Sequence, residues 1–174
     1  MEIPFEQTTK ISRDYAIYAI KTLDSLRTKQ ATPLRFLYMS GHFAPRSMAE
    51  VPEQLKNHGM VNYGLLRVWI ALPIPNPFPS SKSANNWLLE KMGEAEVLVL
   101  KYAADSNGAV QSCVVKPGLI DHPSRDRKEI PGVPHIELLD VAAVLLNQVT
   151  NGFEKDTLSN DDMIRIGQEI RAGN

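Results

Sequence analysis

The chain has 174 residues, of which 43% are hydrophobic and 22% are charged, a composition typical of one globular domain. Nineteen basic and 20 acidic residues leave a net charge of -1, which argues against nucleic acid or an anionic membrane as a partner. One cysteine, Cys113, excludes an internal disulfide, and no leader or membrane-length apolar segment is evident, so we expect a cytoplasmic protein.

The first half of the chain predicts a helix, a strand and an irregular insert. Apolar side chains recur at helical spacing and predict an amphipathic helix over residues 11–28. The apolar and aromatic segment LRFLYMS (34–40) predicts a buried strand that ends in a turn at Gly41. Closely spaced prolines follow further on, so residues 43–80 are interpreted as a proline-rich insert with room for a short helix before Gly59.

A helix and a strand are predicted again in the middle of the chain. One apolar face predicts a helix over 83–104, in which Gly93 suggests a close contact with another backbone segment. The β-branched segment AVQSCVV (109–115) predicts a second strand, because Gly108 and Pro117 bound it.

Two helices are expected to close the chain. The first should begin after Asp140 as its N-cap and be buried on nearly all sides, because its residues are almost entirely apolar. The second should begin at Ser159, with acidic residues in its first turn, and stop at Gly173. Alternation of strands and helices predicts an α/β fold with a parallel sheet and helices on both faces.

Ligands of parallel α/β proteins bind beyond the carboxyl ends of the strands. The two strand ends in this chain are residues 40–42 and residues 116–120. Pro117 cannot continue a strand ladder, and Gly118 allows the backbone to approach a ligand closely. We therefore predict that residues 116–120 form one wall of a ligand crevice, with a plain strand-ending turn as the alternative.

Three segments carry a resemblance to a known family: FLYMSGHFA (36–44), GEAEVLVLKYAADSNGAVQSCVVKPGLI (93–120) and HIELLDVAAVLLNQV (135–149). In this order and spacing they resemble the second half of atypical short-chain dehydrogenases, above all the NmrA-like and nucleoside-sugar-epimerase-like NAD(P)-binding proteins. The resemblance implies a Rossmann-like fold, NAD or NADP as cofactor, and hydride transfer to a small carbonyl or sugar substrate.

The resemblance also implies roles for individual residues. Ser40 matches the family's serine, whose hydroxyl would bind a substrate oxygen, although a hydroxyl bonded to nearby backbone is an equal alternative. The cofactor-binding residues implied by the resemblance are Gly41, Pro117, Gly118, Leu119 and Ile120. The family's Tyr-x-x-x-Lys proton-transfer pair is absent from this sequence. Lys91 is the catalytic candidate nearest the lysine position, about a quarter turn away on the helix, with a solvated lysine as the alternative.

The sequence also contains no glycine-rich phosphate-binding motif. By comparison with the family, the N-terminal strands and glycine-rich loop are expected to be missing. Residues 1–174 would then form a single, truncated NAD(P)-binding domain with weak or no cofactor affinity.

Histidine spacing predicts no metal site. The alternative function is a non-enzymatic regulator that uses the apolar segment near residue 70 for protein contacts, and homo-oligomer formation is left open.

Overall fold

The computed structural model describes residues 13–27, 32–42, 44–47, 82–127, 129 and 132–173, with the backbone alone for 82–92. The chain divides into two compact units. Residues Met1–Ala19 and Phe43–Leu98 belong to the first unit, and Ile20–His42 and Val99–Asn174 belong to the second. The proline-rich part of the predicted insert and its short helix lie outside the described residues.

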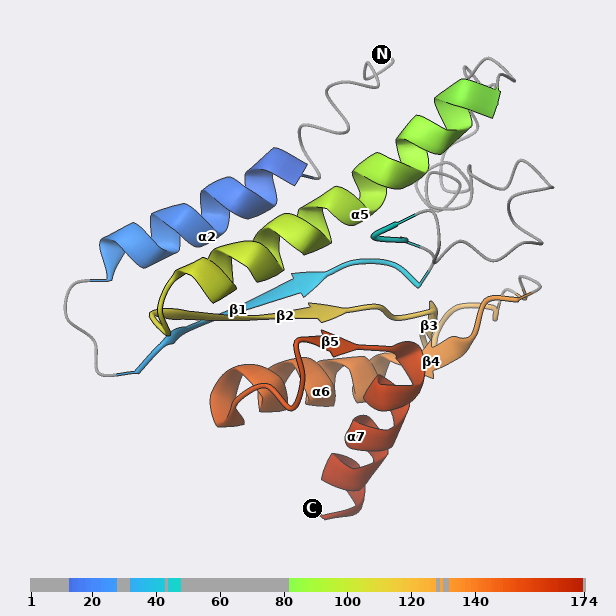
Figure 1. Ribbon diagram of the computed structural model, residues 1–174. Coiled ribbons are helices and arrows are strands. Elements are labelled where there is room, and N and C mark those ends of the chain that lie inside the picture. The colour runs from blue at the N-terminus through green and yellow to red at the C-terminus, as the bar shows by residue number, and fades with distance from the viewer. Residues whose placement is uncertain are drawn as a thin grey trace. The chain divides into compact units, whose positions relative to one another are not determined.

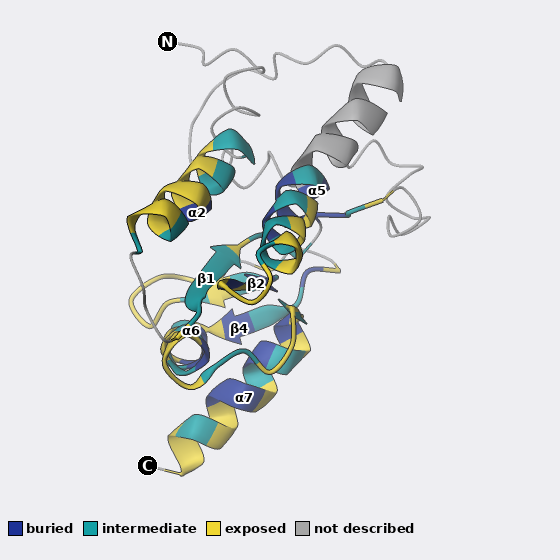
Figure 2. Ribbon diagram, turned by 60° about the vertical axis from the view of Figure 1, so that its left-hand side comes forward, coloured by how far each residue is buried: buried dark blue, intermediate teal, exposed yellow. Residues whose placement is uncertain are grey.

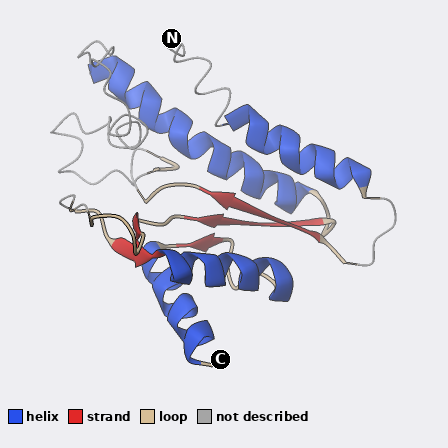
Figure 3. Cartoon of the chain, turned by 180° about the vertical axis from the view of Figure 1, so that it is seen from behind, coloured by secondary structure: helices blue, strands red, loops and turns tan. Residues whose placement is uncertain are grey.

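A three-stranded parallel sheet forms the centre of the second unit (Figure 1). Its strands are β1 (Leu34–Met39), β2 (Val110–Val115) and β5 (Thr157–Leu158), with β2 in the middle. The first two strands pair from Leu34 opposite Val110 to Met39 opposite Val115. The α/β class and the parallel arrangement of the two predicted strands are therefore confirmed (Figure 3).

The central strand is buried on both faces, which is typical of a parallel sheet covered by helices. On one face, Ser112 Oγ donates a 3.1 Å hydrogen bond to the carbonyl oxygen of Val99, in the last turns of helix α5 (Lys82–Asp105). On the other face, Cys113 and Val115 belong to the hydrophobic core formed with helices α6 (Leu138–Asn151) and α7 (Asn160–Ala172). Figure 2 shows that the buried residues concentrate where these elements meet.

The helices predicted over residues 11–28 and 83–104 are present as α2 (Tyr15–Leu26) and α5, respectively. In the second unit, Tyr102 donates a 2.7 Å hydrogen bond from its hydroxyl to Asp24 Oδ2, which connects the ends of these helices and raises the pKa of Tyr102. In the first unit, the close contact predicted for Gly93 is confirmed, because a Cβ atom there would lie 1.8 Å from the carbonyl oxygen of Pro45.

Helix α6 departs from its prediction in two ways. It begins at Leu138, and its N-cap is Glu137, so Asp140 is not the N-cap. Asp140 lies instead in the first turn, buried, with Oδ1 2.8 Å from the guanidinium of Arg171, and this ion pair compensates its charge in place of helix N–H groups. The helix is also not buried all round, because Leu139 and Leu146 are 60% and 66% exposed.

Helix α7 begins and ends as predicted. Ser159 is its N-cap and accepts a hydrogen bond from the backbone N–H of Asp162, whose side chain accepts one from the Ser159 N–H in return. This capping box stabilises the first turn, and Gly173 caps the other end. Gly167 lets α7 cross α6 closely, since a Cβ atom there would meet the Cβ atom of Asp140 at 2.7 Å.

A second, two-stranded parallel sheet was not predicted. It consists of β3 (Leu119–Asp121) and β4 (His135–Glu137), which pair from Leu119 opposite His135 to Asp121 opposite Glu137. Strands of three residues are too short to show a reliable alternation of apolar and polar positions in the sequence. No helix in the described part of the chain is long and apolar enough to cross a membrane.

Candidate functional site

The exits of β1 and β2 remain paired beyond the ends of the strands. The backbone N–H of Ser40 donates to the carbonyl oxygen of Val115 at 2.9 Å, and the N–H of His42 donates to the carbonyl oxygen of Pro117 at 3.1 Å. The loop after β1 therefore runs beside the loop after β2 at the carboxyl edge of the sheet. This is the edge where parallel α/β folds bind their ligands.

The exit of β2 is tightly closed by protein atoms. Pro117 is fully buried, and the N–H of Gly118 donates a 2.8 Å hydrogen bond to Oδ1 of Asn160, the first residue of α7. A Cβ atom at Gly118 would lie 1.9 Å from the carbonyl oxygen of Pro134. At Gly118 the close neighbour is therefore the backbone of Pro134, and the predicted approach to a ligand stays a prediction.

The exit of β1 has more room. A Cβ atom at Gly41 would meet no atom of the described residues within 4 Å, whereas Gly41 itself is half-buried. Gly41 is not among the glycines with positive φ, so its backbone conformation is open to any residue. The open space beside Gly41 and the neighbouring Ser40 is where a ligand could reach the strand end.

Leu119 and Ile120 of β3 help to line a hollow of about 680 Å³, a volume within the range of small-molecule sites. Glu137 of β4 and the loop after β3 complete it. The other lining residues are Asp121, His122, Pro123, Ser124, Arg125, Asp126 and Arg127. Apolar side chains and side chains of both charges therefore meet in one cavity.

His135 holds the carboxylates beside this hollow. Its Nδ1 lies 2.9 Å from Oδ1 of Asp121, and its Nε2 lies 3.1 Å from Oε2 of Glu129. Arg127 approaches the same two acids, with Nε 3.0 Å from Glu129 Oε1 and 3.6 Å from Asp121 Oδ2.

Asp121 and His135 come together only because β3 and β4 pair. No pattern in the sequence indicates that these two side chains would meet. The two residues are 14 positions apart, with neither a metal-like spacing nor a catalytic motif between them. They could have been placed together only by a prediction that β3 pairs with β4.

The predicted site residues fall into both units of the chain. Ser40, Gly41 and residues 117–120 all lie in the second unit, in the segments that follow the carboxyl ends of β1 and β2. Lys91 lies in the first unit, in the part of α5 for which only the backbone is described. Its assignment as a catalytic residue stays a prediction. Within the described part of the chain, no cluster of three His, Cys, Asp or Glu side chains could hold a metal ion.

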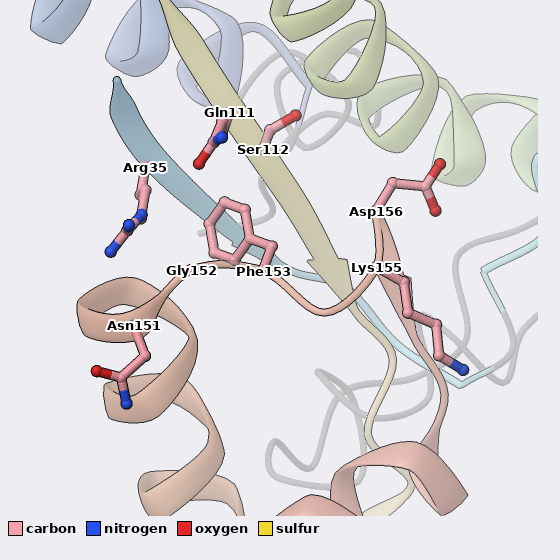
Figure 4. Close-up of a pocket in the computed structure, with 8 residues that line it drawn as sticks. All are labelled: Arg35, Gln111, Ser112, Asn151, Gly152, Phe153, Lys155 and Asp156. Atoms are coloured by element: carbon pink, nitrogen blue, oxygen red, sulfur yellow. The ribbon is translucent and has the colours of Figure 1, made fainter. Parts of the chain in front are cut away.

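A second hollow, of about 500 Å³, lies where β1 and β2 begin (Figure 4). Its two cations are engaged: the Arg35 guanidinium donates to the carbonyl oxygens of Val149 and Thr150, and the Lys155 ammonium donates to Asp162. Figure 4 shows the Lys155 side chain pointing away from Arg35. The two cations do not converge on a common ligand position, so the hollow at the carboxyl edge is the better candidate.

Comparison with models of protein families, with curated proteins and with solved structures finds no match.

Proposed function

We propose that this chain is a Rossmann-like domain that holds the nicotinamide half of NAD or NADP beside a small substrate, beyond the ends of β1 and β2. The observation that carries the proposal is the pairing of the two strand exits through Ser40 with Val115 and His42 with Pro117. Such pairing brings two loops to one edge of a parallel sheet, the position at which this class of fold binds nucleotides.

The surroundings of that edge support a ligand of limited size. Gly41 has open space beside it, and the hollow at Leu119 and Ile120 measures about 680 Å³. Pro117 is fully buried, and Gly118 is closed off by Pro134 and Asn160. In the proposed complex they support the floor of the site, while Ser40, Gly41, Leu119 and Ile120 contact the ligand.

The sequence contains no motif that would bind the adenosine half of a dinucleotide. Phosphates of NAD bind to a glycine-rich turn at a helix N-terminus, and the 174 residues contain no such motif. The adenosine and its phosphate should therefore add little binding free energy. Nicotinamide mononucleotide is expected to bind about as well as NAD, with both dissociation constants in the millimolar range.

Amide-resolved NMR titration tests this proposal. Nicotinamide mononucleotide and NAD should shift the amide signals of Gly41, Leu119 and Ile120, while adenosine monophosphate at the same concentration should leave them in place. A micromolar dissociation constant for NAD, equal binding of adenosine monophosphate, or shifts confined to the hollow near Arg35 would each contradict the proposal.

Catalysis is a separate question from binding. The sequence lacks the Tyr-x-x-x-Lys pair that would transfer a proton during hydride transfer. A non-enzymatic regulator on the same fold is thus the second candidate function. Purified protein should bind nicotinamide mononucleotide without consuming NADH in the presence of carbonyl substrates; steady NADH oxidation that Ser40→Ala abolishes would favour the enzyme instead.

A further inference from the structure

The chain contains two Asn-Gly pairs, Asn107-Gly108 and Asn151-Gly152. In such a pair the backbone nitrogen of the glycine can attack the side-chain amide carbon of the asparagine, because glycine has no Cβ atom to hinder the approach. Both asparagines are exposed, so water reaches both side chains. Whether either pair reacts therefore depends on how the structure holds the glycine nitrogen.

Asn107 and Gly108 are the two central residues of the turn between α5 and β2. The N–H of Ala109 donates to the carbonyl oxygen of Ser106 at 3.1 Å, and the φ angles of Asn107 and Gly108 are 51° and 86°. Positive φ at both central positions is typical of a type I′ turn, whose hydrogen bond is donated by its fourth residue.

The nitrogen of Gly108 takes no part in this turn's hydrogen bond. Its N–H has no acceptor among the residues that the structure describes, and a Cβ atom at Gly108 would meet none of their atoms within 4 Å. The Gly108 nitrogen can thus turn toward the Asn107 side chain without breaking a hydrogen bond of its own to any described residue.

Asn151 and Gly152 are held at the end of α6. The N–H of Gly152 donates to the carbonyl oxygen of Gln148 at 3.2 Å. The same end of the helix is fixed from β1, because the Arg35 guanidinium donates to the carbonyl oxygen of Val149 at 3.1 Å. The Gly152 nitrogen can approach the Asn151 side chain only after this end of the helix opens. Local opening costs free energy, so only a small fraction of molecules is reactive at any time.

We propose that Asn107 is a site of spontaneous covalent modification, at which asparagine is converted to aspartate and isoaspartate, and that Asn151 is protected. The Gly108 nitrogen forms a bond to the side-chain amide carbon of Asn107. The side-chain nitrogen takes up the proton that the Gly108 nitrogen loses and leaves as ammonia, which gives a five-membered succinimide.

Water then opens the succinimide ring in one of two ways. Attack at the side-chain carbonyl carbon restores the normal backbone and leaves aspartate at position 107. Attack at the backbone carbonyl carbon leaves the chain linked through the side chain, as isoaspartate. In sum, asparagine and water give an acid and ammonia, and no oxidant or reductant takes part.

The isoaspartyl product should weaken the second unit, because its backbone is longer by one methylene group. The Ala109 N–H then no longer lies opposite the Ser106 carbonyl oxygen, and the 2.9 Å hydrogen bond from the Val110 N–H to Ser106 Oγ is displaced. The pairing of β1 with β2 begins at this turn, where the N–H of Leu34 donates to the Ala109 carbonyl oxygen at 2.9 Å. The aspartyl product keeps the backbone and should keep the turn, since aspartate tolerates positive φ.

Incubation of the full chain at mildly alkaline pH, followed by proteolysis and mass spectrometry of the peptides, tests the proposal. Aspartate and isoaspartate should accumulate at position 107 at least about tenfold faster than at position 151. In concentrated guanidinium chloride the two rates should agree within about threefold, because no helix end remains to hold Gly152. Equal rates in the folded protein, or an equally large difference in the denatured protein, would overturn the proposal.

The matched variant Asn107→Asp separates the effect of the longer backbone from that of the added charge. It carries the same charge as the isoaspartyl product on a normal backbone. The isoaspartyl protein, separated from unmodified protein by anion exchange, should unfold at a lower denaturant concentration than Asn107→Asp, which should stay close to the wild type. An isoaspartyl protein as stable as Asn107→Asp would contradict the structural role given to this turn.

Discussion

The exits of β1 and β2 lie side by side and each contains a glycine, but the two glycines have different surroundings. Gly118 faces the carbonyl oxygen of Pro134, which a Cβ atom would meet at 1.9 Å, and its N–H is bound by Asn160. Among the residues that the structure describes, Gly41 has no atom within 4 Å of the position a Cβ atom would take. One exit is part of the packed interior, and the other borders open space.

The difference teaches that a glycine after a strand can serve packing or access. At Gly118 the absence of a side chain lets the start of β3 approach the segment before β4, and Leu119 N–H then donates to the Pro134 carbonyl oxygen at 2.8 Å. At Gly41 the absence of a side chain leaves space at the edge of the sheet. Substitutions at and around these two positions can break or sharpen the comparison.

The largest effect is expected for Gly118→Ala. The added methyl group would overlap backbone atoms of Pro134, which cannot move aside without separating β3 from β4. We expect a loss of about 3 kcal/mol in the free energy of unfolding, measured by urea denaturation. A change below about 0.5 kcal/mol would show that the closed exit is less tightly packed than described.

A somewhat smaller loss, about 2 kcal/mol, is expected for Asn160→Ala. Asn160 accepts from the N–H of Gly118 at 2.8 Å and donates to the carbonyl oxygen of His135 at 3.2 Å, so its removal leaves a buried N–H without an acceptor. The control is Asn151→Ala at an exposed position, which should change stability by less than about 0.5 kcal/mol. Equal effects of the two variants would refute the role of Asn160 in closing this exit.

The capping box that begins α7 should make a pH-dependent contribution. Lys155 and the N–H of Ser159 donate to the Asp162 carboxylate and lower its pKa from 3.8 to about 2. A carboxylate with a lowered pKa stabilises the fold above its unfolded pKa, and that stabilisation disappears as the pH falls from about 4 through about 2.

The shift alone corresponds to about 2 kcal/mol, which partial exposure of this ion pair reduces to about 1 kcal/mol. Urea denaturation between pH 2 and pH 5 should show that Asp162→Asn loses this part of the pH dependence. Ser159→Ala should cost about 1 kcal/mol at neutral pH through loss of the cap. A wild-type stability that does not fall between pH 4 and pH 2 would contradict this account of Asp162.

Regular periodicity and local chemistry made much of the fold predictable. The strands at 34–39 and 110–115 and the cap at Ser159 follow from β-branched runs and from side chains that satisfy helix N–H groups nearby in sequence. Asp140 was misassigned because its partner, Arg171, is distant in sequence and is brought near only when α7 crosses α6. A good N-cap residue and a buried ion-pair residue have the same local appearance.

The candidate site was predictable only in outline. The rule that ligands bind at the carboxyl ends of parallel strands directed attention to Gly41 and Gly118. It could not distinguish the open exit from the closed one, because Asn160 and Pro134, which close the second, follow 42 and 16 residues later. The contact between Asp121 and His135 depends likewise on the pairing of two three-residue strands.

The smallest effect on stability, and the sharpest test of the comparison, is expected for Gly41→Ala. A methyl group at Gly41 meets no atom within 4 Å in the described part of the chain, and the backbone there is not left-handed, so the free energy of unfolding should change by less than about 0.5 kcal/mol. The same methyl group would occupy space assigned to the nicotinamide and should weaken binding of nicotinamide mononucleotide at least about threefold in the NMR titration. Unchanged affinity in a fully stable variant would move the ligand away from the exit of β1. A strongly destabilised variant would instead show that this exit is packed like that of β2.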